Sequence, residues 1–100
     1  MIRHVVLWSF KADAEGKSKE ENITAVKDML YSLVPRIPEI KRMEIGVDVT
    51  HSSASMDLML LTEFDTIADL KTYAVHPDHL AVAEYVGKVV ESRVVLDAEI

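Results

Sequence analysis

The hydrophobic and polar positions of this chain alternate in four stretches that predict β-strands. Residues 2–10 and 57–64 are apolar on both alternating faces, which favours strands covered on both sides. Residues 40–49 and 92–100 place apolar side chains mainly on one face, which is typical of strands with a single packed face. Residues 50–55 form a polar connection between the second and third strands.

A first helix is predicted between the first two strands. After a loop over residues 12–17, Ser18 and Glu21 fit a capping box. Apolar residues then recur at helical spacing as far as about Val34, and Pro35 ends the helix.

The segment between the third and fourth strands predicts two shorter helices. Asp65 suits the N-cap of a helix that runs through Tyr73. Pro77 suits the first position of another helix, with His76 extended before it. Its apolar stripe consists of Leu80, Ala83, Val86 and Val90.

The resulting order is βαββαβ, with the second helical region split in two. This order predicts an α+β, ferredoxin-like domain in which helices cover one face of a four-stranded antiparallel sheet. In that topology the first and third strands are central, and they are the two strands with apolar residues on both faces.

Helices on one face leave the other face of the sheet open. An apolar surface with a charged rim usually marks an interface, and two-fold dimers are the commonest assemblies. We therefore expect a homodimer through the open sheet face, although a twisted sheet with scattered exposed aliphatic side chains is the alternative. The expected centre is Val5, Leu7, Met59, Leu61 and Val95, and the expected rim is Arg3, Arg42, Glu44, Arg93 and Asp97.

Composition narrows the class of protein. One hundred residues, 49% of them hydrophobic and 28% charged, predict a single globular domain over residues 1–100. A net charge of −6 argues against nucleic acid as a partner. No apolar stretch is long enough to span a membrane, no signal peptide is evident, and cysteine is absent. These features predict a cytoplasmic protein.

The candidate chemistry lies in the segment from Tyr73 to His79. A phenol and an imidazole that face an apolar cavity suffice for proton transfer without a cofactor. Alternatively, Tyr73 and His79 hydrogen-bond to each other and fix the junction between two helices. His4 shares the parity of Val6 and Trp8, so its ring either joins the cavity or needs a buried partner in the core.

The remaining histidines carry weaker signals. His76 precedes a proline at a turn, where a capping contact is expected. His76 and His79 have the i, i+3 spacing of metal ligands, but no third ligand is evident, so we predict no metal site. His51 lies in a polar loop and is expected to be solvated.

Several motifs together resemble one family. They are the opening Arg3–Lys11 stretch, Glu44-Ile45-Gly46, Asp57, Glu63-Phe64 and, most specifically, Tyr73-x-x-His76-Pro77-x-His79. Over essentially its full length the chain resembles the stress-responsive dimeric α/β-barrel (Dabb) domain. The resemblance implies a homodimer whose two sheets form a central β-barrel with the helices outside. We expect no cofactor. The resemblance does not imply one activity, because members include stress-induced proteins and a polyketide cyclase.

The cyclase branch of that family suggests site residues for this chain. By resemblance, Tyr73 and His79 are the acid and base, and His4 is a further pocket histidine. The pocket lining implied by the same resemblance comprises Val6, Trp8, Val26, Leu30, Leu58, Leu60 and His76. Leu58 replaces a pocket histidine of the cyclase and Trp8 a smaller aliphatic residue, which argues against a long-tailed resorcylic substrate.

Three functions are compatible with these observations. The first is a stress-associated or small-ligand-binding protein. The second is a cofactor-independent cyclase or isomerase acting on a small carbonyl or aromatic, polyketide-like compound through Tyr73 and His79. The third is a protein like the quinol-type monooxygenases. An open cavity that exposes both Tyr73 and His79 would favour the enzyme, whereas a cavity filled by Trp8 would favour the binding protein.

Overall fold

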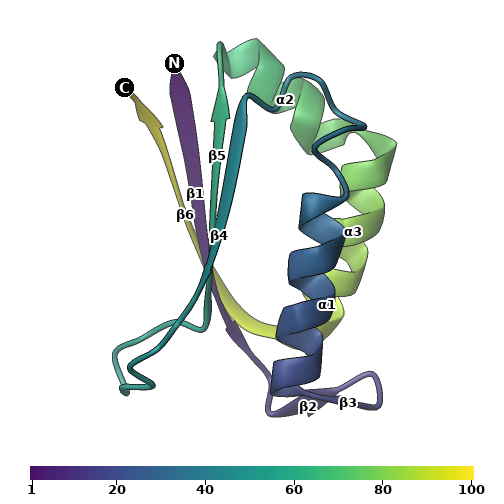
Figure 1. Ribbon diagram of the computed structural model, residues 1–100, viewed down its shortest axis with the longest axis vertical. Helices are drawn as coiled ribbons and strands as arrows, with labels where there is room; N and C mark the ends of the chain where they lie inside the picture. Colours follow the sequence, from purple (N-terminus) through teal and green to yellow (C-terminus); the bar gives the residue numbers. More distant parts are fainter.

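In the computed structural model, which describes residues 1–100, four strands form one antiparallel sheet and the helices cover a single face of it (Figure 1). The sheet order is β4-β5-β1-β6, so β1 and β5 are central, as the sequence predicts. The strands are β1 (Ile2–Phe10), β4 (Arg42–Val47), β5 (Leu58–Phe64) and β6 (Val90–Glu99). The helices are α1 (Lys19–Tyr31), α2 (Ile67–Val75) and α3 (Pro77–Val89).

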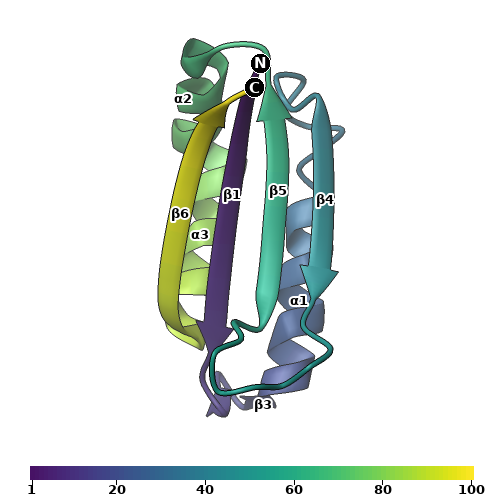
Figure 2. The ribbon, with the colours of Figure 1, turned by 90° about the vertical axis from the view of Figure 1, so that its left-hand side faces the viewer.

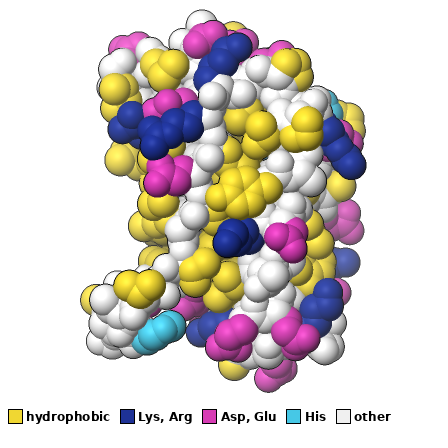
Figure 3. Space-filling model, in the orientation of Figure 1, with side chains coloured by type: hydrophobic (Ala, Val, Ile, Leu, Met, Phe, Trp, Pro, Cys, Tyr) yellow, Lys and Arg dark blue, Asp and Glu magenta, His cyan; other side chains and the backbone are white.

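The core lies between the sheet and the helices. Along β1, buried and half-buried residues alternate strictly, because successive side chains point to opposite faces of the sheet. The buried set, including Val6 and Trp8, meets Val26 and Leu30 of α1 in one continuous hydrophobic cluster. Apolar atoms also reach the surface between β4 and α1, and the connection between β4 and β5 protrudes from the body (Figure 3).

A two-residue hairpin precedes α1 and was not predicted. Strands β2 (Asp13–Ala14) and β3 (Lys17–Ser18) are joined by Glu15 and Gly16, both with positive φ, as a tight hairpin turn requires. The turn brings Ser18 to the start of α1. There the predicted capping box forms, because Ser18 Oγ accepts the Glu21 N–H and the Glu21 carboxylate accepts the Ser18 N–H.

Two helix boundaries differ from the prediction. Helix α1 ends at Tyr31 rather than near Val34, since the chain tightens into i→i+3 turns, with the Leu33 and Val34 N–H groups bonded to Leu30 and Tyr31. The N-cap of α2 is Thr66 and not Asp65, because it is the Thr66 hydroxyl that accepts the Asp69 N–H, at 3.1 Å.

The register of β6 corrects the predicted faces of that strand. Leu96 pairs with Val5 and Val94 with Leu7, so Val94 and Leu96 lie on the open face. Val95 was expected there and instead lies on the helix-facing side. Arg93 and Asp97, expected at the open rim, also lie on the helix-facing side, opposite Trp8 and His4. The reason is that one residue of register reverses every side chain of a strand.

The open face of the sheet is seen in Figure 2, free of any helix. At one end, Glu63 accepts a hydrogen bond from Arg3 at 2.8 Å and lies 3.7 Å from Arg42. The centre of this face is apolar, and two of its members, Val94 and Leu96, are 53% and 64% exposed. Such a continuous apolar strip is unusual on a surface that stays in water.

Candidate functional site

A cavity of about 240 Å³ lies between the sheet and α3, walled by β1, β5 and β6 on one side and by all three helices on the other. Most of its wall is apolar, with two imidazoles, a phenol, an indole and a guanidinium among the lining groups. The lining residues are His4, Val6, Trp8, Leu30, Leu60, Tyr73, His79, Val82, Ala83, Val86, Gly87, Val90 and Arg93.

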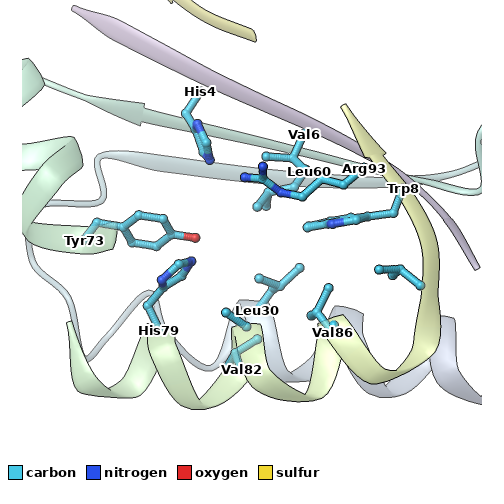
Figure 4. Close-up of a pocket in the computed structure, with 13 residues that line it drawn as sticks. His4, Val6, Trp8, Leu30, Leu60, Tyr73, His79, Val82, Val86 and Arg93 are labelled. Atoms are coloured by element: carbon cyan, nitrogen blue, oxygen red, sulfur yellow. The ribbon is translucent and has the colours of Figure 1, made fainter. Parts of the chain in front are cut away.

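Figure 4 shows how the polar side chains converge. His4 enters from the sheet, Tyr73 from the end of α2, and His79 from the first turns of α3. Of the residues predicted for this site, the structure brings together His4, Val6, Trp8, Leu30, Leu60, Tyr73 and His79. Trp8 lines the cavity without filling it.

Three residues predicted to line the pocket lie elsewhere. Val26 and Leu58 are buried in the core outside the cavity, with 0% and 2% of their surface exposed, because neighbouring side chains cover them. His76 is the N-cap of α3, where its Nδ1 accepts the Asp78 N–H at 3.1 Å. The capping contact expected for His76 is therefore confirmed, and its place in the pocket wall is corrected.

His79 is held in one defined tautomer when neutral. Its Nδ1–H donates to the Ala74 carbonyl oxygen at 3.0 Å, which leaves the lone pair on Nε2. Burial lowers the pKa of His79, and the positive charge of Arg93 acts in the same direction. His79 is thus a neutral imidazole with a free acceptor nitrogen near pH 7.

Tyr73 supplies the complementary group. It is 1% exposed, its ring packs on Phe64 and His79, and its hydroxyl has no hydrogen-bond partner. Burial raises the pKa of Tyr73 to about 12, so the phenol keeps its proton at any physiological pH. The alternative in which Tyr73 and His79 bond to each other is therefore not what the structure contains.

His4 is fixed from the sheet by a residue far away in sequence. Its Nδ1 contacts the carboxylate of Asp97, the residue opposite it on β6. The carboxylate orients the ring, and the ring still borders the cavity (Figure 4). Both readings of His4, as a satisfied core histidine and as a pocket group, thus hold at once.

Arg93 and the indole nitrogen of Trp8 complete the polar lining. Arg93 was not predicted to line the cavity. The side of the sheet on which it lies depends on the register of β6 against β1, and no local sequence pattern indicates that register. Trp8 Nε1 is buried without a hydrogen-bond partner. No group of three or more histidine or acidic side chains is placed to hold a metal ion, and no helix is long and apolar enough to cross a membrane.

The fold and the cavity together define a ferredoxin-like domain with an apolar pocket that contains a phenol and two imidazoles. The family model described as "Stress responsive A/B Barrel Domain" (Dabb) matches residues 2–100. The chain belongs to this family, as the sequence motifs predicted.

Several solved structures share the fold of this chain. A dimeric protein of unknown function from Bacteroides fragilis is 28% identical, with a TM-score of 0.87 over 99% of this chain and 95% of that chain. A dimeric ferredoxin-like protein of unknown function from Thermobifida fusca is 23% identical, with a TM-score of 0.84 over 99% and 90%. The hydroxynitrile lyase of Passiflora edulis is 21% identical, with a TM-score of 0.85 over 99% and 92%. A comparison with curated protein sequences found no significant match.

Proposed function

We propose that this protein is a cofactor-independent enzyme that removes a proton from carbon next to a carbonyl group in a small apolar or aromatic compound. The observation that carries the proposal is the free Tyr73 hydroxyl beside the acceptor nitrogen of His79, in one apolar cavity. A buried donor without a partner is costly for stability, and a substrate oxygen would satisfy it.

The step assigns one role to each group. His79 Nε2 takes the proton, and the electron pair of the broken C–H bond moves into the carbon–carbon bond of an enolate. The carbonyl oxygen gains the negative charge, which the Tyr73 hydroxyl stabilises by donating its hydrogen bond. Return of the proton to another atom completes an isomerisation, whereas attack of the enolate carbon on a second carbonyl closes a ring, as in a polyketide-type cyclisation.

The size of the cavity limits the substrate. A buried cavity of ~150 Å³ admits benzene, so a cavity of about 240 Å³ suits one aromatic ring with small substituents or a small fused ring. The Asp97 carboxylate orients His4, and we assign His4 to position the substrate from the sheet side.

The assembly is a further part of the proposal. We infer a homodimer through the open sheet face, in which Leu7 and Leu61 of the central strands and Leu96 of β6 become buried. The dimeric state of the relatives from Bacteroides fragilis and Thermobifida fusca supports this. The cytoplasmic location and a stress-associated role stay predictions.

The test is deuterium incorporation at the α-carbon of 2-indanone in D₂O, followed by ¹H NMR. The protein should accelerate exchange, and His79→Gln should reduce the enzymatic rate by roughly 10²–10⁴-fold, the size of a general acid–base contribution. The matched control is His51→Gln, since His51 is exposed on the β4–β5 loop outside the cavity. Exchange no faster than the buffer rate, or equal rates for wild type and His79→Gln, would contradict the proposal.

A binding protein without catalysis is the second candidate, and the apolar character of the cavity favours it. Tight binding of 2-indanone with no exchange above the buffer rate would identify this function. The likeness to an antibiotic biosynthesis monooxygenase, at 13% identity, concerns the fold alone.

A further inference from the structure

Arg93 is the one arginine of this chain without a carboxylate partner. Arg3, Arg36 and Arg42 each lie within 4.0 Å of an acidic side chain. Arg93 forms no ion pair, and its guanidinium takes part in no hydrogen bond. Arg93 is exposed at the edge strand β6, where water can hydrate its guanidinium, and the same side chain also borders the apolar cavity, so it can meet a ligand there.

The side chain of Arg93 points toward the cavity. It stands opposite Trp8 in the β1–β6 register, on the side of the sheet that faces the helices. Figure 4 shows the guanidinium reaching across the cavity toward His4 and Tyr73. Asp97, an acid on the same side of β6 by register, is already engaged by His4.

Besides the acceptor nitrogen of His79, the cavity holds two further polar groups without partners, and both are donors. The Tyr73 hydroxyl and the Trp8 indole N–H are both buried without partners. A guanidinium and an indole N–H can only donate, and the phenol keeps its proton. A ligand that satisfies all three must present several acceptor oxygens, and a carboxylate next to the reacting carbonyl does so.

We propose that Arg93 binds a carboxylate of the substrate, so that the enzyme acts on small carbonyl compounds that are also carboxylic acids. The planar fork of an arginine matches the two oxygens of a carboxylate, which gives orientation as well as affinity. With the carboxylate at Arg93, on the β6 side, the carbonyl oxygen lies toward Tyr73 and the adjacent C–H toward His79. This inference names the substrate class of the proposed acid–base site and rests on that function.

Binding of matched acids and amides tests the inference without requiring turnover. The probes are benzoate, phenylacetate and hexanoate, each compared with its amide by calorimetric titration at pH 7.5. Wild type should bind at least one acid about ten- to a hundredfold more tightly than its amide, as expected for charge-assisted hydrogen bonds. Arg93→Met should reduce acid binding to the level of the amide and leave amide binding unchanged, and Arg93→Lys should restore part of it.

A matched control removes a charge nearby. Lys88 lies on α3 outside the cavity lining, in a surface pair with Glu84 at 3.9 Å, so Lys88→Met should keep the preference for acids. Equal affinities for acid and amide in wild type, no binding of any acid at millimolar concentration, or unchanged acid binding in Arg93→Met would overturn the inference. So would a lower molecular mass of Arg93→Met in light scattering, because Arg93 would then pair with a second copy of the chain.

The two proposals fail separately. Suppose that His79→Gln abolishes exchange on uncharged 2-indanone while Arg93→Met leaves acid binding unchanged. The proposed acid–base function is then supported, and the proposed carboxylate site at Arg93 is contradicted. If wild type prefers the acids and loses that preference in Arg93→Met, but no exchange occurs, Arg93 belongs to a binding protein for carboxylates.

Discussion

The rings of Tyr73 and His79 pack with their centroids 4.3 Å apart, yet no hydrogen bond joins them. The Nδ1–H of His79 donates to the Ala74 carbonyl oxygen, and the Tyr73 hydroxyl has no hydrogen-bond partner. The two groups therefore contribute independently, one as a proton acceptor and one as a donor. This arrangement separates stability from activity in a way that mutation can measure.

Tyr73→Phe should leave stability intact and impair activity. The hydroxyl makes no hydrogen bond in the fold, so its removal should change the free energy of unfolding by less than about 0.5 kcal/mol or raise it. Exchange on 2-indanone should fall by roughly 10–10³-fold, as expected for loss of one oxyanion donor. Urea unfolding and the NMR exchange assay measure the two effects.

Tyr85→Phe is the matched control for Tyr73→Phe. The Tyr85 hydroxyl donates to Asn22 Oδ1 at 2.6 Å, and Asn22 of α1 is fully buried, with its amide donating to the Ala14 carbonyl of β2. Its loss should cost about 1–3 kcal/mol of stability with exchange unchanged. A destabilised Tyr73→Phe with normal exchange would reinstate a purely structural role for Tyr73.

The pH–rate profile should be set by His79 on its acidic side. Only neutral imidazole accepts a proton, so the rate should rise with pH through the pKa of His79. Because burial lowers that pKa below the ordinary 6.5, the midpoint of the rise should lie below pH 6.5. No alkaline decline is expected up to pH 10, since the pKa of Tyr73 is about 12. A rate that falls between pH 5 and 7 would exclude His79 as the base.

The lowered pKa of His79 also makes the free energy of unfolding depend on pH. Well above the ordinary pKa of 6.5, His79 is neutral in both the folded and the unfolded chain, and its lowered pKa does not affect stability. As pH falls through 6.5, His79 becomes protonated in the unfolded chain while it stays neutral in the folded chain. Stability therefore decreases as pH falls toward the pKa of His79 in the folded chain. Urea unfolding at pH 7.5 and 5.5 should therefore show a larger loss for wild type than for His79→Gln, and equal losses would contradict the burial effect.

The register of β6 predicts opposite effects for two adjacent residues. Leu96→Lys should give monomer or insoluble protein, because a lysine without a partner would be desolvated on the open face. Val95→Lys, on the other side of the same strand, should keep the dimer, although Val95 is 47% exposed. Leu7→Lys and Leu61→Lys should behave like Leu96→Lys. Light scattering measures the molecular mass of each variant. Unchanged dimers for all the open-face variants would place the interface elsewhere.

The capping box at Ser18 should matter for stability only. Ser18→Ala removes the acceptor of the Glu21 N–H at 3.2 Å and should cost about 0.5–2 kcal/mol. The melting temperature should fall while ligand binding at the cavity persists, since Ser18 is not among the lining residues. Impaired binding at unchanged stability would bring this segment into the site.

Local patterns in the sequence were sufficient for the elements and their order. Period-two alternation marks β1, and the Ser18 and Pro77 signals place the starts of α1 and α3, because these features act within a few residues. The βαββαβ order then limits the topology to the observed sheet. The Tyr73-to-His79 segment was likewise recognisable, since its residues are neighbours along the chain.

Which groups face the cavity, and which of their polar atoms stay unpaired, depends on contacts between residues far apart in the sequence. Asp97 meets His4 across 93 residues of sequence, and Arg93 enters the pocket through a register that a β-bulge at Ser9 and Phe10 helps to set. A shift of one residue reverses the faces of a strand, and alternation along β6, with valine or leucine at 94, 95 and 96, cannot distinguish the two phases. The fold and the tyrosine–histidine pair could therefore be predicted from local sequence patterns, whereas the charged side chain that faces this pair depends on long-range strand pairing.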